Sequence, residues 1–235
     1  YRALCTNSTG FKNTASGNYA SQLNTTGDCN SSFGYQALRN ATTANNNTAS
    51  GYQALRNTTT GSGNTAVGSR SLYENTTGVN TAVGFCAAGK NTTGSHNTVI
   101  GRCANYLNTT GGCNTVMGDH ALHYNSGNYN TAVGRLAGYC SIGSNNVYIG
   151  YKTACISTTA NYNTFVGDQS GVYNTVGDCH TSLGSQSGPS TCNLTNTIAI
   201  GYCVSVAANN YTCIGNSATV CSVVPNISTN CFTTG

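Results

Sequence analysis

The stretch Asn64-Thr65-Ala66-Val67-Gly68 recurs in related form along the whole chain. Its last residue is one of thirteen marker glycines, which follow one another at steps of 14 to 17 residues. They are Gly17, Gly34, Gly51, Gly68, Gly84, Gly101, Gly118, Gly134, Gly150, Gly167, Gly184, Gly201 and Gly215. Self-similarity at a fixed period is the signature of a repeat protein, in which each repeat contacts only its neighbours along one axis. We therefore expect an array of about thirteen coils, mostly of 16–17 residues, and no single globular core.

The residues before each marker glycine predict a short strand. The residue immediately before it is large and apolar in eleven of thirteen copies, the residue two before it is usually small, and the residue three before it is Thr in ten. Such a run, ended by glycine, is typical of a strand, and its side chains alternate between two faces. The threonine and the apolar residue therefore share one face. Because Ile198 and Ile200 both occupy that face, we expect it to be the inward one.

A second motif follows the glycine, most clearly in Tyr52-Gln53-Ala54-Leu55, and predicts a second short strand in tight packing. A polar turn such as residues 57–61 then closes the repeat, because Asn, Thr and Gly suit turns. Two short strands and two turns per repeat predict an all-β fold, a parallel β-solenoid or β-roll. We assign residues 1–219 to this array and residues 220–235 to a C-terminal cap or a subunit-connecting segment.

Stacked coils bring equivalent residues about 4.8 Å apart, so thirteen coils predict a rod on the order of 60 Å long. Ladders of Asn amides and of branched apolar side chains would hold the coils together. The column of Ala and Ser would then lie on the outside, where small residues favour close approach of another chain. This pattern predicts a parallel trimer.

Composition narrows the function classes. Charged residues make up only 6% of the chain, and the net charge of +4 comes without a basic run, so we expect no nucleic-acid partner. No apolar run approaches the length of a membrane helix. The thirteen cysteines favour an extracellular location, secreted or on a cell or virion surface. The five acidic residues form no catalytic pair in the sequence, so we expect no enzyme and no cofactor.

Two histidines are a candidate metal site. His120 and His123 lie three residues apart in one coil and could ring a trimer axis around a metal ion. We expect them instead to be solvated surface side chains, with no metal.

Several cysteines are candidates for disulfides. Cys86 and Cys103 occupy the same position in consecutive coils, where their Cα atoms would lie about 5 Å apart, within disulfide range. The other candidate pairs are Cys140 with Cys155, Cys179 with Cys192, Cys203 with Cys213, and Cys221 with Cys231. The alternative is that some are buried free thiols. The odd total leaves one thiol unpaired or intermolecular.

Asn-x-Ser/Thr sequons are frequent and predict N-glycosylation on one edge of the rod. Because an Asn- and Thr-rich turn also creates sequons by composition alone, we expect partial occupancy at most. The candidates are Asn7, Asn24, Asn40, Asn57, Asn75, Asn91, Asn108, Asn193, Asn210 and Asn226.

The repeat resembles a known family. Asn196-Thr197-Ile198-Ala199-Ile200-Gly201 is similar to the Asn-Ser-Val-Ala-Ile-Gly strand in the head repeats of trimeric autotransporter adhesins, the haemagglutinin-type β-roll. The form Gly-Tyr-Gln-Ala-Leu, followed by Asn-Thr-Thr-Gly, is similar to repeats of phage and giant-virus fibre proteins. The resemblance implies a left-handed, trimeric β-roll with a role in surface fibres or attachment.

The two ends suggest further assembly. Tyr1-Arg2-Ala3-Leu4 matches residues 52–55, so the sequence begins inside a repeat, either after a removed leader or as a piece of a longer array. Gly235 placed before Tyr1 recreates the repeat. We therefore expect subunits to add head to tail into a filament.

These features favour a non-catalytic structural subunit of an extracellular or virion-surface fibre. The first alternative is an adhesin that binds a receptor or a glycan. The second is an ice-binding protein, because ten coils carry the threonine. We rank ice binding low, because the threonine shares the face expected to be the core.

Overall fold

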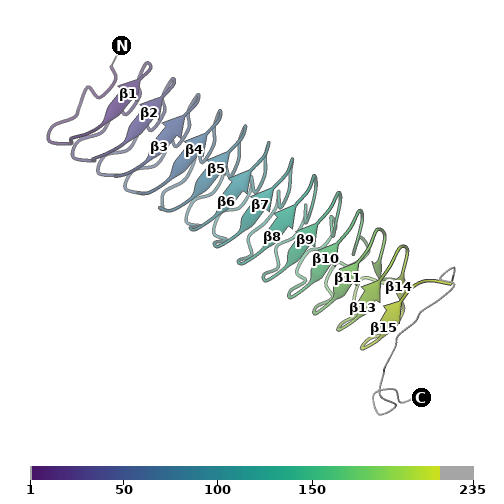
Figure 1. Ribbon diagram of the computed structural model, residues 1–235. Helices are drawn as coiled ribbons and strands as arrows, with labels where there is room; N and C mark the ends of the chain where they lie inside the picture. The colour runs from purple at the N-terminus through teal and green to yellow at the C-terminus, as the bar shows by residue number, and fades with distance from the viewer. Residues whose placement is uncertain (1, 218–235) are drawn as a thin grey trace.

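The computed structural model describes residues 2–217, which form a rod of stacked coils (Figure 1). Thirteen three-residue strands pair in chain order into one parallel sheet. They are β1 (Thr14–Ser16), β2 (Ser31–Phe33), β3 (Thr48–Ser50), β4 (Thr65–Val67), β5 (Thr81–Val83), β6 (Thr98–Ile100), β7 (Thr115–Met117), β8 (Thr131–Val133), β9 (Val147–Ile149), β10 (Thr164–Val166), β11 (Thr181–Leu183), β13 (Ile198–Ile200) and β15 (Thr212–Ile214). The predicted all-β parallel solenoid is confirmed.

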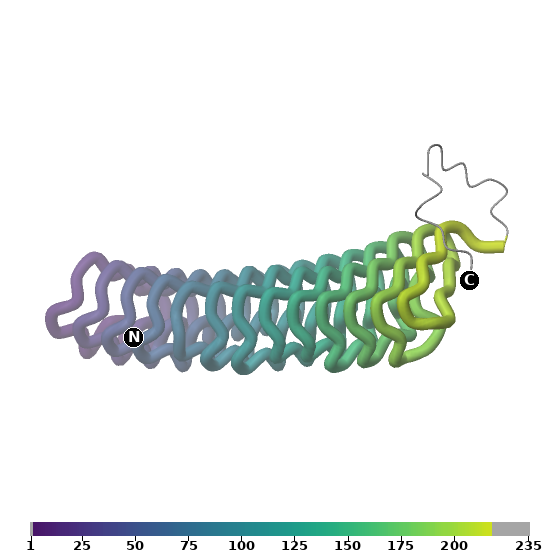
Figure 2. Tube along the Cα trace, turned by 90° about the horizontal axis from the view of Figure 1, so that it is seen from below, coloured from purple at the N-terminus to yellow at the C-terminus, as the bar shows by residue number. Residues whose placement is uncertain are grey.

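The coils lie one behind another along a gently bowed axis (Figure 2). Twelve steps of about 4.8 Å give the sheet a length of about 58 Å. Its register follows the repeat, so that Thr65 pairs with Thr81 and Val67 with Val83. The marker glycines form a column. Gly68 has a φ of 124°, and a Cβ there would lie 2.5 Å from the carbonyl oxygen of Gly84, so only glycine fits this close stacking.

The segment after the marker glycine is a run of turns, and the prediction of a second strand in every coil is wrong. Within residues 2–217, strand pairing there occurs only between β12 (Gly188–Pro189) and β14 (Ser205–Val206). Elsewhere the second and fourth residues after the glycine adopt left-handed backbone angles, such as φ 56° at Gln53 and φ 51° at Leu55. Gln and Leu give no sequence signal for that conformation, which usually favours Gly, Asn or Asp.

The core is thin and consists mainly of small side chains. The middle residue of each strand points inward, so that Ala66 is fully buried while 39% of Val67 is exposed. Ala49 in β3 meets Ala54 and Leu55 of the following turn inside the coil, and all three are fully buried. The predicted alternation of faces is confirmed, but the assignment of its inside and outside is wrong. A coil of 16–17 residues leaves room for alanine from one wall and leucine from the other.

An internal ladder of asparagines links the coils, as the sequence predicts. It occupies the position four residues before each of the first ten marker glycines, from Asn13 to Asn163. The backbone N–H of Asn64 donates to Oδ1 of Asn47 at 2.9 Å, and Nδ2 of Asn64 donates to the carbonyl oxygen of Thr77 at 2.9 Å. Oδ1 of Asn64 in turn accepts from the backbone N–H of Asn80 at 3.0 Å. These amides are almost fully buried, so their hydrogen bonds offset the cost of removing them from water.

No helix in residues 2–217 is long and apolar enough to cross a membrane. The predicted cap at residues 220–235 lies outside the described residues.

Candidate functional site

One regular surface of the rod is formed by the outward-pointing side chains of the large sheet. We call it the outer face and define it by the first and third residues of the thirteen strands. The first residues are Thr14, Ser31, Thr48, Thr65, Thr81, Thr98, Thr115, Thr131, Val147, Thr164, Thr181, Ile198 and Thr212. The third residues are Ser16, Phe33, Ser50, Val67, Val83, Ile100, Met117, Val133, Ile149, Val166, Leu183, Ile200 and Ile214. None of these side chains is charged.

The threonines of the outer face point away from the core, which differs from the prediction. The threonines share a face with the large apolar residues, as predicted, but that face points outward. Thr81, Thr98 and Thr115 are exposed on consecutive strands. The reason for ranking ice binding low, namely that the threonines face the core, is therefore wrong.

The apolar column of the outer face is unusually exposed. Met117 exposes 46% of its surface, Val67 39% and Ile100 38%. A scattered apolar residue on a surface is ordinary, but a continuous apolar column marks a surface for interaction. The predicted inward apolar ladder is thus an outward one, and the predicted outer column of Ala and Ser lies inside the coil.

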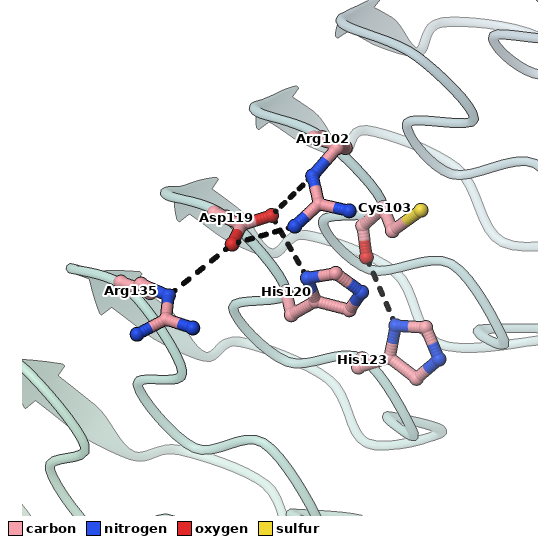
Figure 3. Close-up of polar contacts among 6 residues, drawn as sticks. All are labelled: Arg102, Cys103, Asp119, His120, His123 and Arg135. Carbon is pink, nitrogen blue, oxygen red and sulfur yellow. Dashed lines mark hydrogen bonds and ion pairs between the residues drawn. The ribbon is translucent and has the colours of Figure 1, made fainter.

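A polar cluster lies beside the outer face in the middle of the rod (Figure 3). Asp119 accepts from Arg102 of the preceding coil at 3.0 and 3.1 Å and from Arg135 of the following coil at 3.3 Å. Nδ1 of His120 lies 2.8 Å from the same carboxylate. Burial raises the pKa of Asp119, but hydrogen bonds with His120 and Arg102 outweigh this effect and lower it overall. This cluster was not anticipated, although Arg, Asp and Arg at equivalent repeat positions could have revealed it.

His120 and His123 lie together, with ring centroids 5.1 Å apart. The ring of His123 also stacks between Tyr106 and Tyr139, at 5.5 and 5.3 Å. Its Nδ1 lies 3.1 Å from the carbonyl oxygen of Cys103, and burial lowers its pKa. Both histidines are therefore half-buried and packed, whereas solvated side chains were expected. Among the described residues, no three His, Cys, Asp or Glu side chains gather around a possible metal.

Four of the predicted glycosylation sites lie inside the coil. Asn24, Asn75, Asn91 and Asn108 are at most 1% exposed. The last three form a second internal ladder, in which Nδ2 of Asn91 donates to Oδ1 of Asn75 at 2.8 Å and Nδ2 of Asn108 donates to Oδ1 of Asn91 at 3.2 Å. A glycan cannot attach to an amide in that position in the folded coil. The partly or fully exposed Asn7, Asn40, Asn57, Asn193 and Asn210 stay predictions, and Asn226 lies outside the described residues.

The eleven described cysteines, all but Cys221 and Cys231, are free thiols in this structure. Cys86 and Cys103 nevertheless occupy equivalent positions in consecutive coils, as predicted, and burial raises the pKa of both thiols. The backbone N–H of Cys140 donates to the carbonyl oxygen of Cys155 at 3.3 Å, so this pair is also adjacent.

The other two described pairs are less well placed. Sγ of Cys203 donates to Gln186 at 3.3 Å, whereas Cys213 packs against the buried cluster formed by Ala199, Val204 and Val206. Cys179 and Cys192 are both exposed. All four pairings stay predictions that mass spectrometry without reduction can test.

No family model, no curated protein and no solved structure matches this chain. The resemblance to trimeric adhesin heads therefore rests on the repeat motif, and what is established is the parallel β-solenoid itself.

Proposed function

We propose that this chain is a non-catalytic structural subunit of an extracellular or virion-surface fibre, in which three copies pack side by side through their outer faces. The observation that carries the proposal is the exposed apolar column on a face without a single charged side chain. Burying such a face costs no charge desolvation and removes apolar surface from water.

The dimensions of the outer face support this arrangement. Strands of three residues are about 10 Å wide, so a sheet about 58 Å long presents roughly 600 Å² per chain. A standard interface buries about 800 Å² per partner. In a trimer each chain divides its outer face between two neighbours, so side chains that flank the face must add to each contact. In a parallel arrangement each coil meets its equivalent, which places Val against Val and Thr against Thr along the axis.

Light scattering on the purified chain tests the proposal. A trimer has a mass of about 72 kDa, three times the chain mass of 24.1 kDa. A mass of 24.1 kDa at every concentration would refute lateral assembly. Head-to-tail growth remains a separate prediction, because Tyr1 and residues 218–235 lie outside the described part of the chain.

The outward threonine column favours ice binding as a second candidate function. Hydroxyl and methyl groups repeat on this face every 4.8 Å or so, on a parallel backbone held by hydrogen bonds between coils. A regular, rigid array of this kind can order a layer of water.

The two candidate functions use the same surface and exclude each other within one assembly. A monomer that shows thermal hysteresis and shapes ice crystals would establish the second candidate. A trimer without hysteresis would support the first and exclude the second.

A further inference from the structure

One coil lacks a side chain where its neighbours carry large ones. The fifth residue after the marker glycine is Arg56, Tyr73, Gly89, Tyr106 and His123 in five consecutive coils. The missing side chain at Gly89 leaves a hollow of about 310 Å³ between the two tyrosines. Ligand sites in proteins begin at about this size.

The backbone does not demand glycine at this position. Gly89 does not have the left-handed φ of the marker glycines. A Cβ there would lie 2.9 Å from Cε2 of Tyr106, so that tyrosine ring leans over the glycine. The carbonyl oxygen of Cys86 would also lie close to that Cβ, at 3.2 Å. The glycine therefore leaves room both for the Tyr106 ring and for the hollow beside it.

The lining combines aromatic rings with an excess of positive charge. Tyr73 and Tyr106 lie on opposite sides of Gly89, and Arg70, Lys90 and Glu74 complete the lining. Nζ of Lys90 lies 2.7 Å from Oε1 of Glu74, and this hydrogen bond raises the pKa of Lys90. Lys90 thereby neutralises the charge of Glu74. Arg70 adds a second positive charge, so the lining carries a net positive charge.

Arg70 retains donors for a ligand. Its guanidinium makes one side-chain hydrogen bond, from Nε to Oε1 of Gln53 at 3.3 Å. A guanidinium has five donors in a planar fork, which suits two-point binding of a carboxylate or a sulfate. Gln36 and Gln53 occupy the same repeat position in the two preceding coils. The arginine is therefore not a general feature of the coil. It lines the hollow and also lies over the ring of Tyr52 in the preceding coil, 5.9 Å from the ring centroid.

We propose that this hollow binds one pyranose ring that carries an anionic group, as in an acidic glycan. The faces of tyrosine rings are electron-rich and attract the weakly positive C–H groups on the flat side of a sugar. Arg70 would hold the carboxylate or sulfate, and the ion pair of Lys90 with Glu74 would offer hydrogen bonds to hydroxyl groups.

This pocket is separate from the outer face. Its residues belong to the turns after Gly68, Gly84 and Gly101, whereas the outer face consists of strand residues before the marker glycines. Sugar binding and lateral assembly can therefore succeed or fail independently.

Saturation-transfer NMR on the whole chain tests the proposal. The probes are glucuronic acid, N-acetylneuraminic acid, glucose 6-sulfate and neutral glucose. We expect saturation of the acidic sugars but not of glucose, and the two acid types distinguish a carboxylate site from a sulfate site. Equal signals for glucose, or none for any sugar, would overturn it.

Two variants and a matched control locate the binding. Arg70→Gln restores the residue type of the preceding coils and should weaken binding of the acidic sugars at least tenfold. Gly89→Tyr fills the hollow and should abolish binding. Lys152→Gln removes a cation from the same repeat position as Arg70, five coils away, and should leave binding unchanged. If Gly89→Tyr does not fold, Arg70→Gln alone tests the site. Unchanged binding of the acidic sugars by folded Arg70→Gln would refute the proposal.

Discussion

The ring of Phe165 occupies the space that a side chain at Gly171 would need, because a Cβ at position 171 would overlap the ring of this phenylalanine. Both residues face the interior of one coil. In the coil of Gly51 the same two positions hold Ala49 and Leu55. The interior volume is thus nearly constant, and either wall can supply the larger side chain.

This exchange predicts strong coupling between the two positions. Phe165→Ala should lower the free energy of unfolding by about 3–5 kcal/mol, because it leaves a cavity. Gly171→Leu alone should also destabilise, since the ring blocks its side chain. The double variant recreates the pair found at Ala49 and Leu55, and should regain more than half of the loss from Phe165→Ala. Urea unfolding of the four proteins measures the coupling, and additive losses would contradict it.

The buried His180 should make the rod less stable in mild acid. It replaces asparagine in the internal ladder, is 1% exposed, and its Nδ1 lies 2.7 Å from Oγ1 of Thr197. Burial is the largest effect on its pKa and lowers it from the ordinary 6.5, while the nearby backbone of Leu194 and the charge of Asp178 act in the opposite direction. The unfolded chain therefore binds a proton at a pH where the folded chain does not.

The direction of the pH effect follows from that difference. Stability is complete above pH 6.5 and falls as the pH drops from there towards the lowered folded pKa. His180→Asn should reduce this loss, and a remainder should persist because the pKa of His123 is also lowered. Thermal melts of both proteins between pH 8 and pH 5 measure the difference. Parallel curves for the two proteins would refute the role of His180.

Val79 is held in a backbone conformation that disfavours a β-branched residue. Its φ is 61°, and 54% of its surface is exposed. Asn46 and Asn145 occupy the same repeat position with φ 56° and 61°. Val79→Asn should therefore stabilise the chain by about 1 kcal/mol, or roughly 2–4 °C in Tm. The reverse change, Asn145→Val, should destabilise it, and calorimetry compares the two. A lower Tm for Val79→Asn would show that the side chain of Val79 contributes contacts that outweigh the strain.

A carboxylate on the outer face should prevent lateral assembly. Val83 lies in β5 and is 37% exposed. Val83→Glu would place an uncompensated charge in the proposed interface and should weaken association roughly a hundredfold. Val176 is 46% exposed but lies outside the strands, so Val176→Glu serves as the matched control and should leave the mass unchanged. Light scattering at several concentrations reads out both variants. An equal effect of the two changes would mean that the outer face is not the contact.

The sequence predicted the stacking of coils because glycine, asparagine and threonine repeat at fixed positions, and the columns at Gly68, Asn64 and Thr65 are all present. It did not reveal which face of the strand is buried. The usual rule places branched residues such as Val67 inside and gives no preference to Ala66, but the interior of a 17-residue coil is too narrow for two walls of large side chains. The buried sequon at Asn91 shows the same limit, because a turn motif does not indicate which way its amide points.

The hollow at Gly89 could have been found by aligning the repeats, since it is a glycine between Tyr73 and Tyr106 in one column. The same alignment could have shown the ion pair, because Lys90 and Glu74 are equivalent residues of consecutive coils. It could not have shown how the ring of Tyr106 leans over Gly89, which depends on side-chain conformation.

The uniform register also has a consequence for length. Each coil makes the same backbone contacts with the coil before it and the coil after it. Removal or duplication of one whole unit, such as residues 52–68, would leave every remaining column aligned. The length of the rod can therefore change in increments of about 4.8 Å through duplication or deletion of whole units in the gene.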